Sequence, residues 1–115
     1  MKSKSKINNK IEIKTGCDIV KIDRFRNIKP EMAKKIFHKS ELKNQKPGTL
    51  AGIFAAKESC KKVFNDLNWL DIEIRKKRNG KPILIINKEN IKSCDISISH
   101  DGNYAVANTV FLLEK

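Results

Sequence analysis

Two acidic residues and one lysine are the side chains of this sequence best suited to chemistry. Glu58 and Lys62 lie four positions apart within residues 50–64, where apolar residues recur at the spacing of a helix with one buried face. These apolar residues are Ile53, Ala56, Cys60, Val63 and Phe64. At about 100° per residue, Glu58 and Lys62 fall on the opposite face, one turn apart. On spacing alone, a solvated Glu–Lys pair is the simplest interpretation.

The second acidic residue, Asp18, follows a predicted strand near the start of the chain. Residues 11–15 alternate apolar and polar side chains, which is typical of a half-buried strand. Gly16 comes next, and a glycine at a strand's end lets the backbone turn tightly and present a carboxylate in a cleft. Taken alone, an aspartate in this position is more often a turn or capping residue.

Two β-hairpins are predicted after the central helix. The first turns at Asn79–Gly80 and carries five basic side chains at its tip, and the second turns at Asp101–Gly102. The basic tip has a simpler interpretation as a solvated turn, and His100 as a hydrogen-bonded surface residue. The four strands are predicted at residues 69–74, 81–86, 95–100 and 104–111.

Two short helices are predicted between the first strand and the central helix. Pro30 suits a first helical turn and supports a helix over residues 30–37. Ser40 is the expected cap of a second short helix, and Thr49 of the central one. His38 is expected to lie at the surface or to have its hydrogen bonds satisfied.

Four segments, taken in order, resemble motifs of one enzyme family. The central helix carries Phe54-Ala-Ala-Lys-Glu-Ser59, followed by Lys62, and Gly16-Cys-Asp-Ile19 is followed by an arginine six residues after its aspartate. The other two segments are Glu73-Ile-Arg75 with Asn79-Gly-Lys-Pro82, and Ser97-Ile-Ser-His100 followed by Tyr104-Ala-Val-Ala107. Over roughly residues 11–112 the chain resembles the holo-acyl-carrier-protein synthases, small bacterial members of the phosphopantetheinyl transferase family.

The resemblance implies an enzyme of fatty acid biosynthesis. It would transfer 4′-phosphopantetheine from coenzyme A to a serine of apo-acyl carrier protein and release adenosine 3′,5′-bisphosphate. The family residues matching Asp18 and Glu58 bind Mg²⁺, an ion that prefers oxygen ligands, and the residue matching Lys62 contacts phosphate. These three residues would be catalytic, because phosphoryl transfer depends on charge neutralisation and positioning. Either a metal-bound water or Glu58 could take the serine's proton.

The resemblance also assigns binding residues, a fold and an assembly. Arg24 matches the arginine that meets the acidic helix of the acyl carrier protein, and Arg26 lies beside it. The implied fold is α+β, with antiparallel strands and a central packed helix. The family forms homotrimers, so the coenzyme A contacts would be divided between two subunits. These contacts are Lys62, Gly80, Lys81, Pro82, Ser99 and His100.

Two positions depart from the family pattern. Relatives commonly have an arginine where this chain has Ile53, so a phosphate contact is either lost or taken over by Lys57, Lys61 or the basic hairpin. Larger relatives often have a second acidic residue where this chain has Val20. Water would fill that coordination position, which suits Mg²⁺ because the ion keeps several waters.

Length and composition indicate one globular domain. The chain has 115 residues, 39% of them apolar and 33% charged, which suits a folded domain of this size. We expect this domain at residues 11–115 and a flexible basic arm at residues 1–10. No apolar run reaches the roughly 18 residues of a membrane span, and no signal peptide is recognisable. The three cysteines, Cys17, Cys60 and Cys94, are expected to be reduced core residues of a cytoplasmic protein.

The net charge of +12, from 25 basic and 13 acidic residues, favours an anionic partner. An acidic carrier protein would explain this charge. The alternative is a small nucleic-acid-binding module that uses the basic arm and hairpin. That alternative leaves Asp18 and Glu58 unexplained, because carboxylates repel phosphate unless a metal intervenes. We therefore expect neither a nucleic-acid partner nor membrane insertion.

Overall fold

The computed structural model describes residues 10–115, so the expected basic arm lies outside the described residues except for Lys10. These residues form five strands, two α-helices and three short 3₁₀ segments. In order these are β1 (Ile11–Lys21), η1 (Ile22–Phe25), α1 (Pro30–Ile36), η2 (Glu41–Lys43), α2 (Pro47–Val63), η3 (Trp69–Asp71), β2 (Ile72–Lys76), β3 (Pro82–Ile86), β4 (Ile91–Asp101) and β5 (Tyr104–Glu114).

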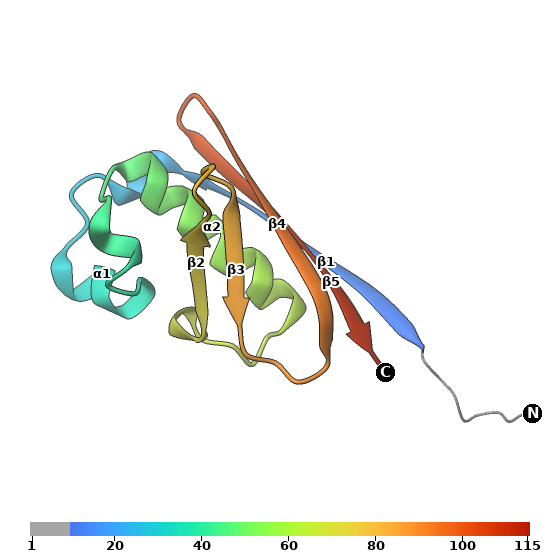
Figure 1. Ribbon diagram of the computed structural model, residues 1–115. Helices are drawn as coiled ribbons and strands as arrows, with labels where there is room; N and C mark the ends of the chain where they lie inside the picture. Colours follow the sequence, from blue (N-terminus) through green and yellow to red (C-terminus); the bar gives the residue numbers. More distant parts are fainter. Residues whose placement is uncertain (1–9) are drawn as a thin grey trace, which may run out of the picture.

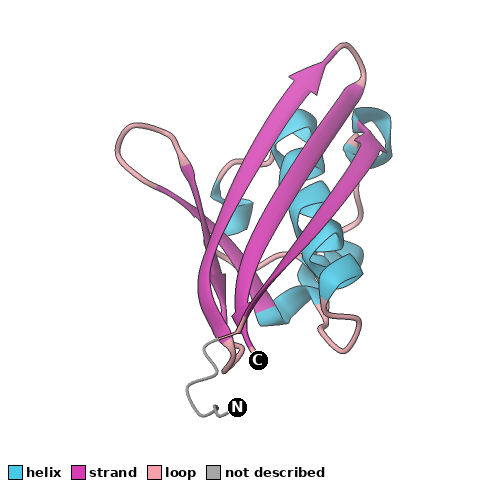
Figure 2. Cartoon of the chain, turned by 90° about the vertical axis from the view of Figure 1, so that its right-hand side faces the viewer, coloured by secondary structure: helices cyan, strands magenta, loops and turns pink. Residues whose placement is uncertain are grey.

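The strands form two antiparallel sheets packed around α2 (Figure 1). The larger sheet has the order β1-β5-β4, and the smaller one is the β2–β3 hairpin. Figure 2 shows the three long strands side by side across the helix. Both predicted hairpins are present, and Gly80 and Gly102 adopt the positive φ of +87° and +56° that their turns require. The expected α+β fold with antiparallel strands and a central helix is confirmed.

α2 is buried on more sides than its apolar stripe predicted. Every residue from Leu50 to Lys57 is buried, as are Ser59 and Cys60. The larger sheet, the hairpin and the segments before α2 enclose this part of the helix, so small residues such as Ala51 and Ala55 are needed all round it. Solvent reaches the first turn, at residues 47–49, and the last turns, which carry Glu58.

Several predicted boundaries are corrected by local hydrogen bonds. The first strand was predicted to end before Gly16, but β1 continues through Gly16 and ends at Lys21. The segment Trp69–Asp71 is a 3₁₀ turn and not a strand, because Asn68 and Asp71 form a reciprocal capping box. Neither expected serine or threonine cap forms. α2 begins at Pro47, before Thr49, and the Ser40 hydroxyl donates to Glu73.

The predicted core position of the cysteines holds for one of the three. Cys60 is buried, and burial raises the pKa of its thiol to about 12. Cys94 is half-buried, and Cys17 is exposed because its position in β1 faces away from α2. All three are free thiols. Among the described residues, none of the helices combines the length and apolar character needed to cross a membrane.

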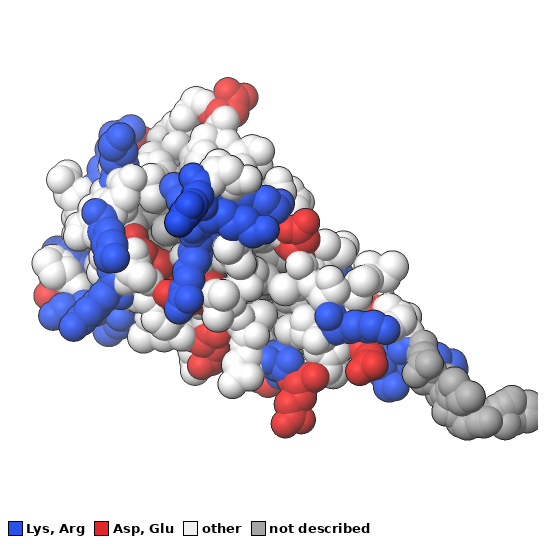
Figure 3. All heavy atoms as spheres, viewed as in Figure 1, with Lys and Arg blue, Asp and Glu red and all other residues white. Residues whose placement is uncertain are grey.

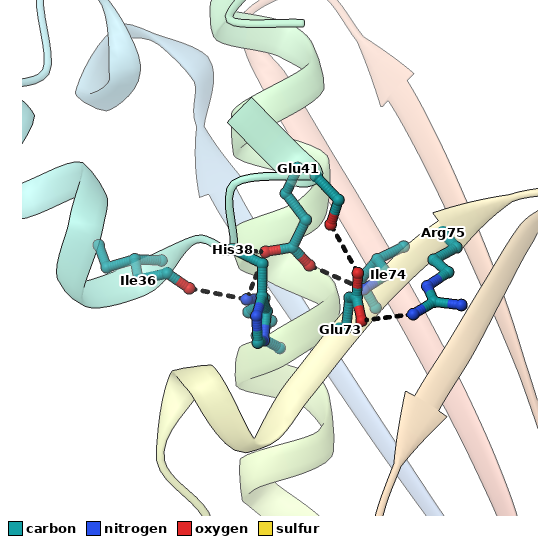
Figure 4. A network of polar contacts seen from close by, with 8 residues as sticks. Ile36, His38, Glu41, Glu73, Ile74 and Arg75 are labelled. Carbon is teal, nitrogen blue, oxygen red and sulfur yellow. Dashed lines mark hydrogen bonds and ion pairs between the residues drawn. The ribbon is translucent and has the colours of Figure 1, made fainter. Parts of the chain in front are cut away.

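A buried ion pair fixes α2 against its surroundings (Figure 4). Lys57 of α2 and Glu41 of η2 expose no side-chain surface, and Lys57 Nζ lies 2.7 Å from Glu41 Oε1. Lys57 also donates to the Ile36 carbonyl at the end of α1, over 2.7 Å. Glu41 accepts hydrogen bonds from the backbone N–H groups of His38 and Ile74, each over 2.7 Å. The pair therefore joins α1, η2, α2 and β2.

This ion pair overturns two expectations. Lys57 cannot replace the family arginine as a phosphate contact, because its ammonium is enclosed; burial lowers its pKa and the Glu41 carboxylate opposes that shift. His38 is half-buried, and its Nε2 has no hydrogen-bond partner among the described residues. The bond from its backbone to Glu41 holds the residue against the interior.

The ion pair predicts a strongly non-additive effect on stability. Glu41→Ala should lower the free energy of unfolding by about 3–5 kcal/mol, because it leaves a buried ammonium without its counter-charge. Adding Lys57→Met to Glu41→Ala should lower the free energy of unfolding by much less than Lys57→Met does in the wild type. Urea unfolding of the wild type, both single variants and the double variant measures the coupling. Additive costs would show that the two charges do not depend on each other.

Candidate functional site

Gly16 brings β1 into direct contact with α2. A Cβ atom added at this position would overlap the carbonyl oxygen of Ser59 and lie 3.1 Å from Thr109 Oγ1. The glycine is therefore needed for close approach of two backbones and not, as expected, for a turn. Because alternate residues of a strand share a face, Asp18 also points toward α2.

Asp18 meets Lys62 at the C-terminal end of α2. The Lys62 ammonium donates to Asp18 Oδ1 over 3.1 Å and to the Cys17 carbonyl over 2.7 Å. The Asp18 side chain is 18% exposed and that of Lys62 is 55% exposed. The structure thus brings together two of the three predicted catalytic residues.

Glu58, the third predicted catalytic residue, lies one turn before Lys62 and has different hydrogen-bond partners. Its Oε2 accepts a hydrogen bond of 2.6 Å from Trp69 Nε1 and lies 3.5 Å from Lys61 Nζ. The solvated Glu58–Lys62 pair that spacing suggested does not form, because Lys62 is engaged by Asp18. The Glu58 side chain is 29% exposed, so solvent or a ligand can reach it.

The two carboxylates supply the oxygen ligands that a hard cation such as Mg²⁺ prefers. Each has one oxygen in a hydrogen bond or ion pair, and the contacts of residues 10–115 leave Asp18 Oδ2 and Glu58 Oε1 without a protein donor. In the same part of the chain, His, Cys, Asp and Glu side chains nowhere form a group of three or more suited to a metal ion. A cation here would take its other ligands from water or a bound anion, as Mg²⁺ commonly does.

Three of the predicted coenzyme A residues line one cavity beside the first turns of α2. Gly80, Pro82 and His100 border a space of about 190 Å³, together with Ile53 and Lys76. His100 Nε2 lies 2.9 Å from the Gly48 carbonyl in the first turn of α2. Besides Gly80, Pro82 and His100, the cavity is lined by Thr49, Gly52, Ile53, Ile74, Lys76 and Ile98.

The remaining predicted coenzyme A residues lie elsewhere. Ser99 alternates with His100 along β4, so its side chain faces away from α2. Lys81 Nζ lies 3.5 Å from Asp95 Oδ1 and borders an open cavity of about 640 Å³ on the outer side of the larger sheet. One chain therefore does not gather all the predicted coenzyme A contacts.

The two predicted docking arginines project from η1 and the residue after it. The Arg24 guanidinium lies 5.2 Å from the centre of the Phe54 ring, and Arg24 borders a cavity of about 290 Å³ that includes Met32 and Trp69. Arg26 Nε lies 2.7 Å from Asp23 Oδ1. Arg26, with Asn103, holds the pKa of Asp23 below its ordinary value. Both arginines are exposed.

Basic side chains cover the hairpin tip and the α1 side of the molecule (Figure 3). The exposed basic residues of the tip are Arg75, Lys76, Lys77, Arg78 and Lys81. Because Lys76 also lines the cavity that contains His100, the positive surface continues into that cavity. This arrangement favours an anion there.

Trp69 was not predicted to be part of the site. The sequence pattern predicted a strand at this residue, but the 3₁₀ turn brings its indole to Glu58. A partly buried tryptophan needs a partner for its N–H group, and this requirement was the available signal. The partner could not be read from the sequence, because it lies eleven residues away across an irregular loop.

Comparison with known proteins identifies relatives over most of the chain. A family model described as the 4′-phosphopantetheinyl transferase superfamily matches residues 14–109. A holo-acyl-carrier-protein synthase of Campylobacter fetus subsp. fetus (strain 82-40) is 39% identical over 110 residues, which cover 83% of this chain and 96% of that protein. One of Bacillus subtilis (strain 168) is 36% identical over 110 residues, covering 83% and 91%. The crystal structure of Helicobacter pylori holo-acyl-carrier-protein synthase in complex with coenzyme A matches with a TM-score of 0.77 at 34% identity, covering 85% of this chain and 99% of that one.

Proposed function

The chain belongs to the 4′-phosphopantetheinyl transferase superfamily, and we propose that it is a magnesium-dependent holo-acyl-carrier-protein synthase. It transfers 4′-phosphopantetheine from coenzyme A to a serine of apo-acyl carrier protein and releases adenosine 3′,5′-bisphosphate, a step of fatty acid biosynthesis. The observation that carries this proposal is the placement of Asp18 against Lys62, with Glu58 one turn away on the same helix. The three free thiols suit a reducing compartment, and we place the enzyme in the cytoplasm.

Asp18 and Glu58 would hold the metal through the two carboxylate oxygens that have no donor among residues 10–115. When bound, Mg²⁺ supplies positive charge and Lewis acidity at the pyrophosphate of coenzyme A. Lys62 keeps its ammonium in place through the Cys17 carbonyl and Asp18. This fixed charge can stabilise the negative charge that develops on the transferred phosphate.

The cavity lined by Gly80, Pro82 and His100 is the proposed site for the nucleotide end of coenzyme A. Its lining also supports a replacement for the phosphate contact of the family arginine. Lys76 of the basic hairpin borders the same cavity as Ile53, which stands where relatives have that arginine. The other candidate, Lys61, already lies 3.5 Å from Glu58 Oε2. We therefore assign the replacement phosphate contact to Lys76.

Carboxylate substitutions test the activity and its metal dependence together. Asp18→Asn and Glu58→Gln should each lower transfer by about 100-fold or more, because each removes a charged metal ligand without changing side-chain size. Mass spectrometry of apo-acyl carrier protein after incubation with enzyme, coenzyme A and Mg²⁺ measures the gain of one phosphopantetheine group. The matched control is Glu89→Gln, an exposed residue of the β3–β4 loop. Absence of any mass gain with the wild type would refute the function, and full activity of either variant would remove that residue from the site.

Docking of the acidic carrier protein is assigned to Arg24 and, beside it, Arg26. Reversing the charge at Arg24 should raise KM for the carrier by about tenfold and leave KM for coenzyme A within about twofold, because rim charges mainly govern association. Steady-state kinetics at low salt measures both constants. Lys92→Glu makes the same change of charge at the start of β4, where no docking is proposed. Equal effects of the two reversals would show that only net charge matters.

Assembly as a homotrimer is supported by the outer face of the larger sheet, which points away from α2. Ile13 and Ile19 of β1 are 65% and 63% exposed there. Asp18 and His100 lie on the two edge strands of this sheet, with β5 between them, so one coenzyme A is reached more easily by Asp18 of one subunit and His100 of a neighbour. Three such head-to-tail contacts close a ring.

Two measurements test the trimer. Ile13→Glu should dissociate it in analytical ultracentrifugation, whereas Ile85→Glu, at a 41% exposed position of β3, should not. Co-refolded Asp18→Asn and His100→Ala chains should then exceed the mean activity of the separate variants, because random mixing leaves about a quarter of the interfaces intact. A monomeric wild type, or mixed activity equal to the mean despite subunit exchange, would contradict the shared site.

A further inference from the structure

Trp69 holds one of the two oxygens of Glu58. Its indole Nε1 donates to Glu58 Oε2 over 2.6 Å, a short hydrogen bond between a neutral donor and a carboxylate. Lys61 Nζ lies 3.5 Å from the same oxygen. Both contacts converge on Oε2, and the contacts of residues 10–115 leave Oε1 without a protein donor. The Glu58 carboxylate therefore has one oxygen held by these two contacts and one oxygen that a ligand can reach.

The indole that makes this hydrogen bond has two ring contacts, and the turn that carries it is fixed by hydrogen bonds. Its ring lies 6.2 Å from the ring of Phe54, centre to centre, at an angle of 38°. Lys61 Nζ lies 4.1 Å from the ring centre in a cation–π contact. The capping box of Asn68 and Asp71 fixes the backbone of the turn that carries Trp69. The N–H group is therefore directed at Glu58 before any ligand binds.

We propose that Trp69 is a positioning residue of the cation site: by holding Oε2 of Glu58, it presents Oε1 to the metal. This inference rests on the assignment of Glu58 as a metal ligand in the proposed function. Without the N–H group, the Glu58 carboxylate could rotate, because Lys61 would be its only remaining polar partner among residues 10–115. Hydrogen bonds that orient a metal-ligating side chain commonly contribute a factor of about ten or more to metal affinity.

The test removes the N–H group and keeps the aromatic ring. Trp69→Phe should weaken Mn²⁺ binding by about tenfold, measured by electron paramagnetic resonance in the presence of coenzyme A. The KM for Mg²⁺ should rise by a similar factor, while kcat at saturating Mg²⁺ and KM for coenzyme A stay within about twofold. Leu70→Ala, at the exposed neighbouring position of the same turn, is the control and should leave all four constants unchanged. Unchanged Mn²⁺ affinity in Trp69→Phe would overturn the inference.

Two further measurements separate this inference from the proposed function. Glu58→Gln should abolish Mn²⁺ binding; if it binds Mn²⁺ like the wild type, the metal assignment itself fails. If Glu58→Gln loses binding and Trp69→Phe does not, only the role of Trp69 fails. Trp69 is the single tryptophan of the chain, so bound Mn²⁺ should quench the fluorescence of the wild type. This readout does not depend on how well Trp69→Phe folds, and an unquenched tryptophan beside bound Mn²⁺ would contradict the placement.

Discussion

Lys57 enters the interior of the protein as a charged residue, and the arrangement of the elements around α2 depends on how that charge is accommodated. Its ammonium reaches the Glu41 carboxylate and the Ile36 carbonyl, while Glu41 also takes the backbone N–H group of Ile74. A buried ion pair adds little net stability over an apolar pair. What it supplies here is orientation. The next residue, Glu58, is rotated by about 100° about the helix axis, so fixing Lys57 inward fixes Glu58 toward solvent.

The two ends of α2 are suited to opposite charges. Its first turn lies beside the cavity that contains His100 and Lys76, at the positive end of the helix dipole. Its last turns carry Glu58, Lys61 and Lys62, and the lysines there complement the negative end. The same lysines limit repulsion between Glu58 and Asp18. In the proposed trimer, the first turn of α2 in one subunit and the last turns of α2 in a neighbour would together serve the phosphates and the metal-bound pyrophosphate of one coenzyme A.

The parts of the fold that depend on local pattern were predictable from the sequence, and the parts that depend on tertiary contact were not. Period-two alternation predicted the long strands, and Asn79–Gly80 and Asp101–Gly102 predicted both turns. Gly16 was misinterpreted, because only the position of Ser59 explains why it lacks a side chain. The burial of Lys57 escaped prediction for the same reason: its partner Glu41 lies in a separate segment. Asp18 and Lys62 were paired through family motifs and not through spacing, which carries no information across 44 residues.

Side chains of the larger sheet alternate between two faces, and the two faces have different roles. In β1, Gly16, Asp18 and Val20 face α2, and the residues between them face outward. The inward set closes the core and delivers the carboxylate of Asp18 to Lys62. The outward set includes Ile13 and Ile19, which are the basis of the proposed contact with a neighbouring subunit. A slip of one residue in the pairing of β1 with β5 would exchange the two sets. It would turn Gly16 and Val20 outward, move the Asp18 carboxylate to the outer face and remove the apolar outer surface in a single step. The proposed catalytic site and the proposed assembly therefore depend on the same register.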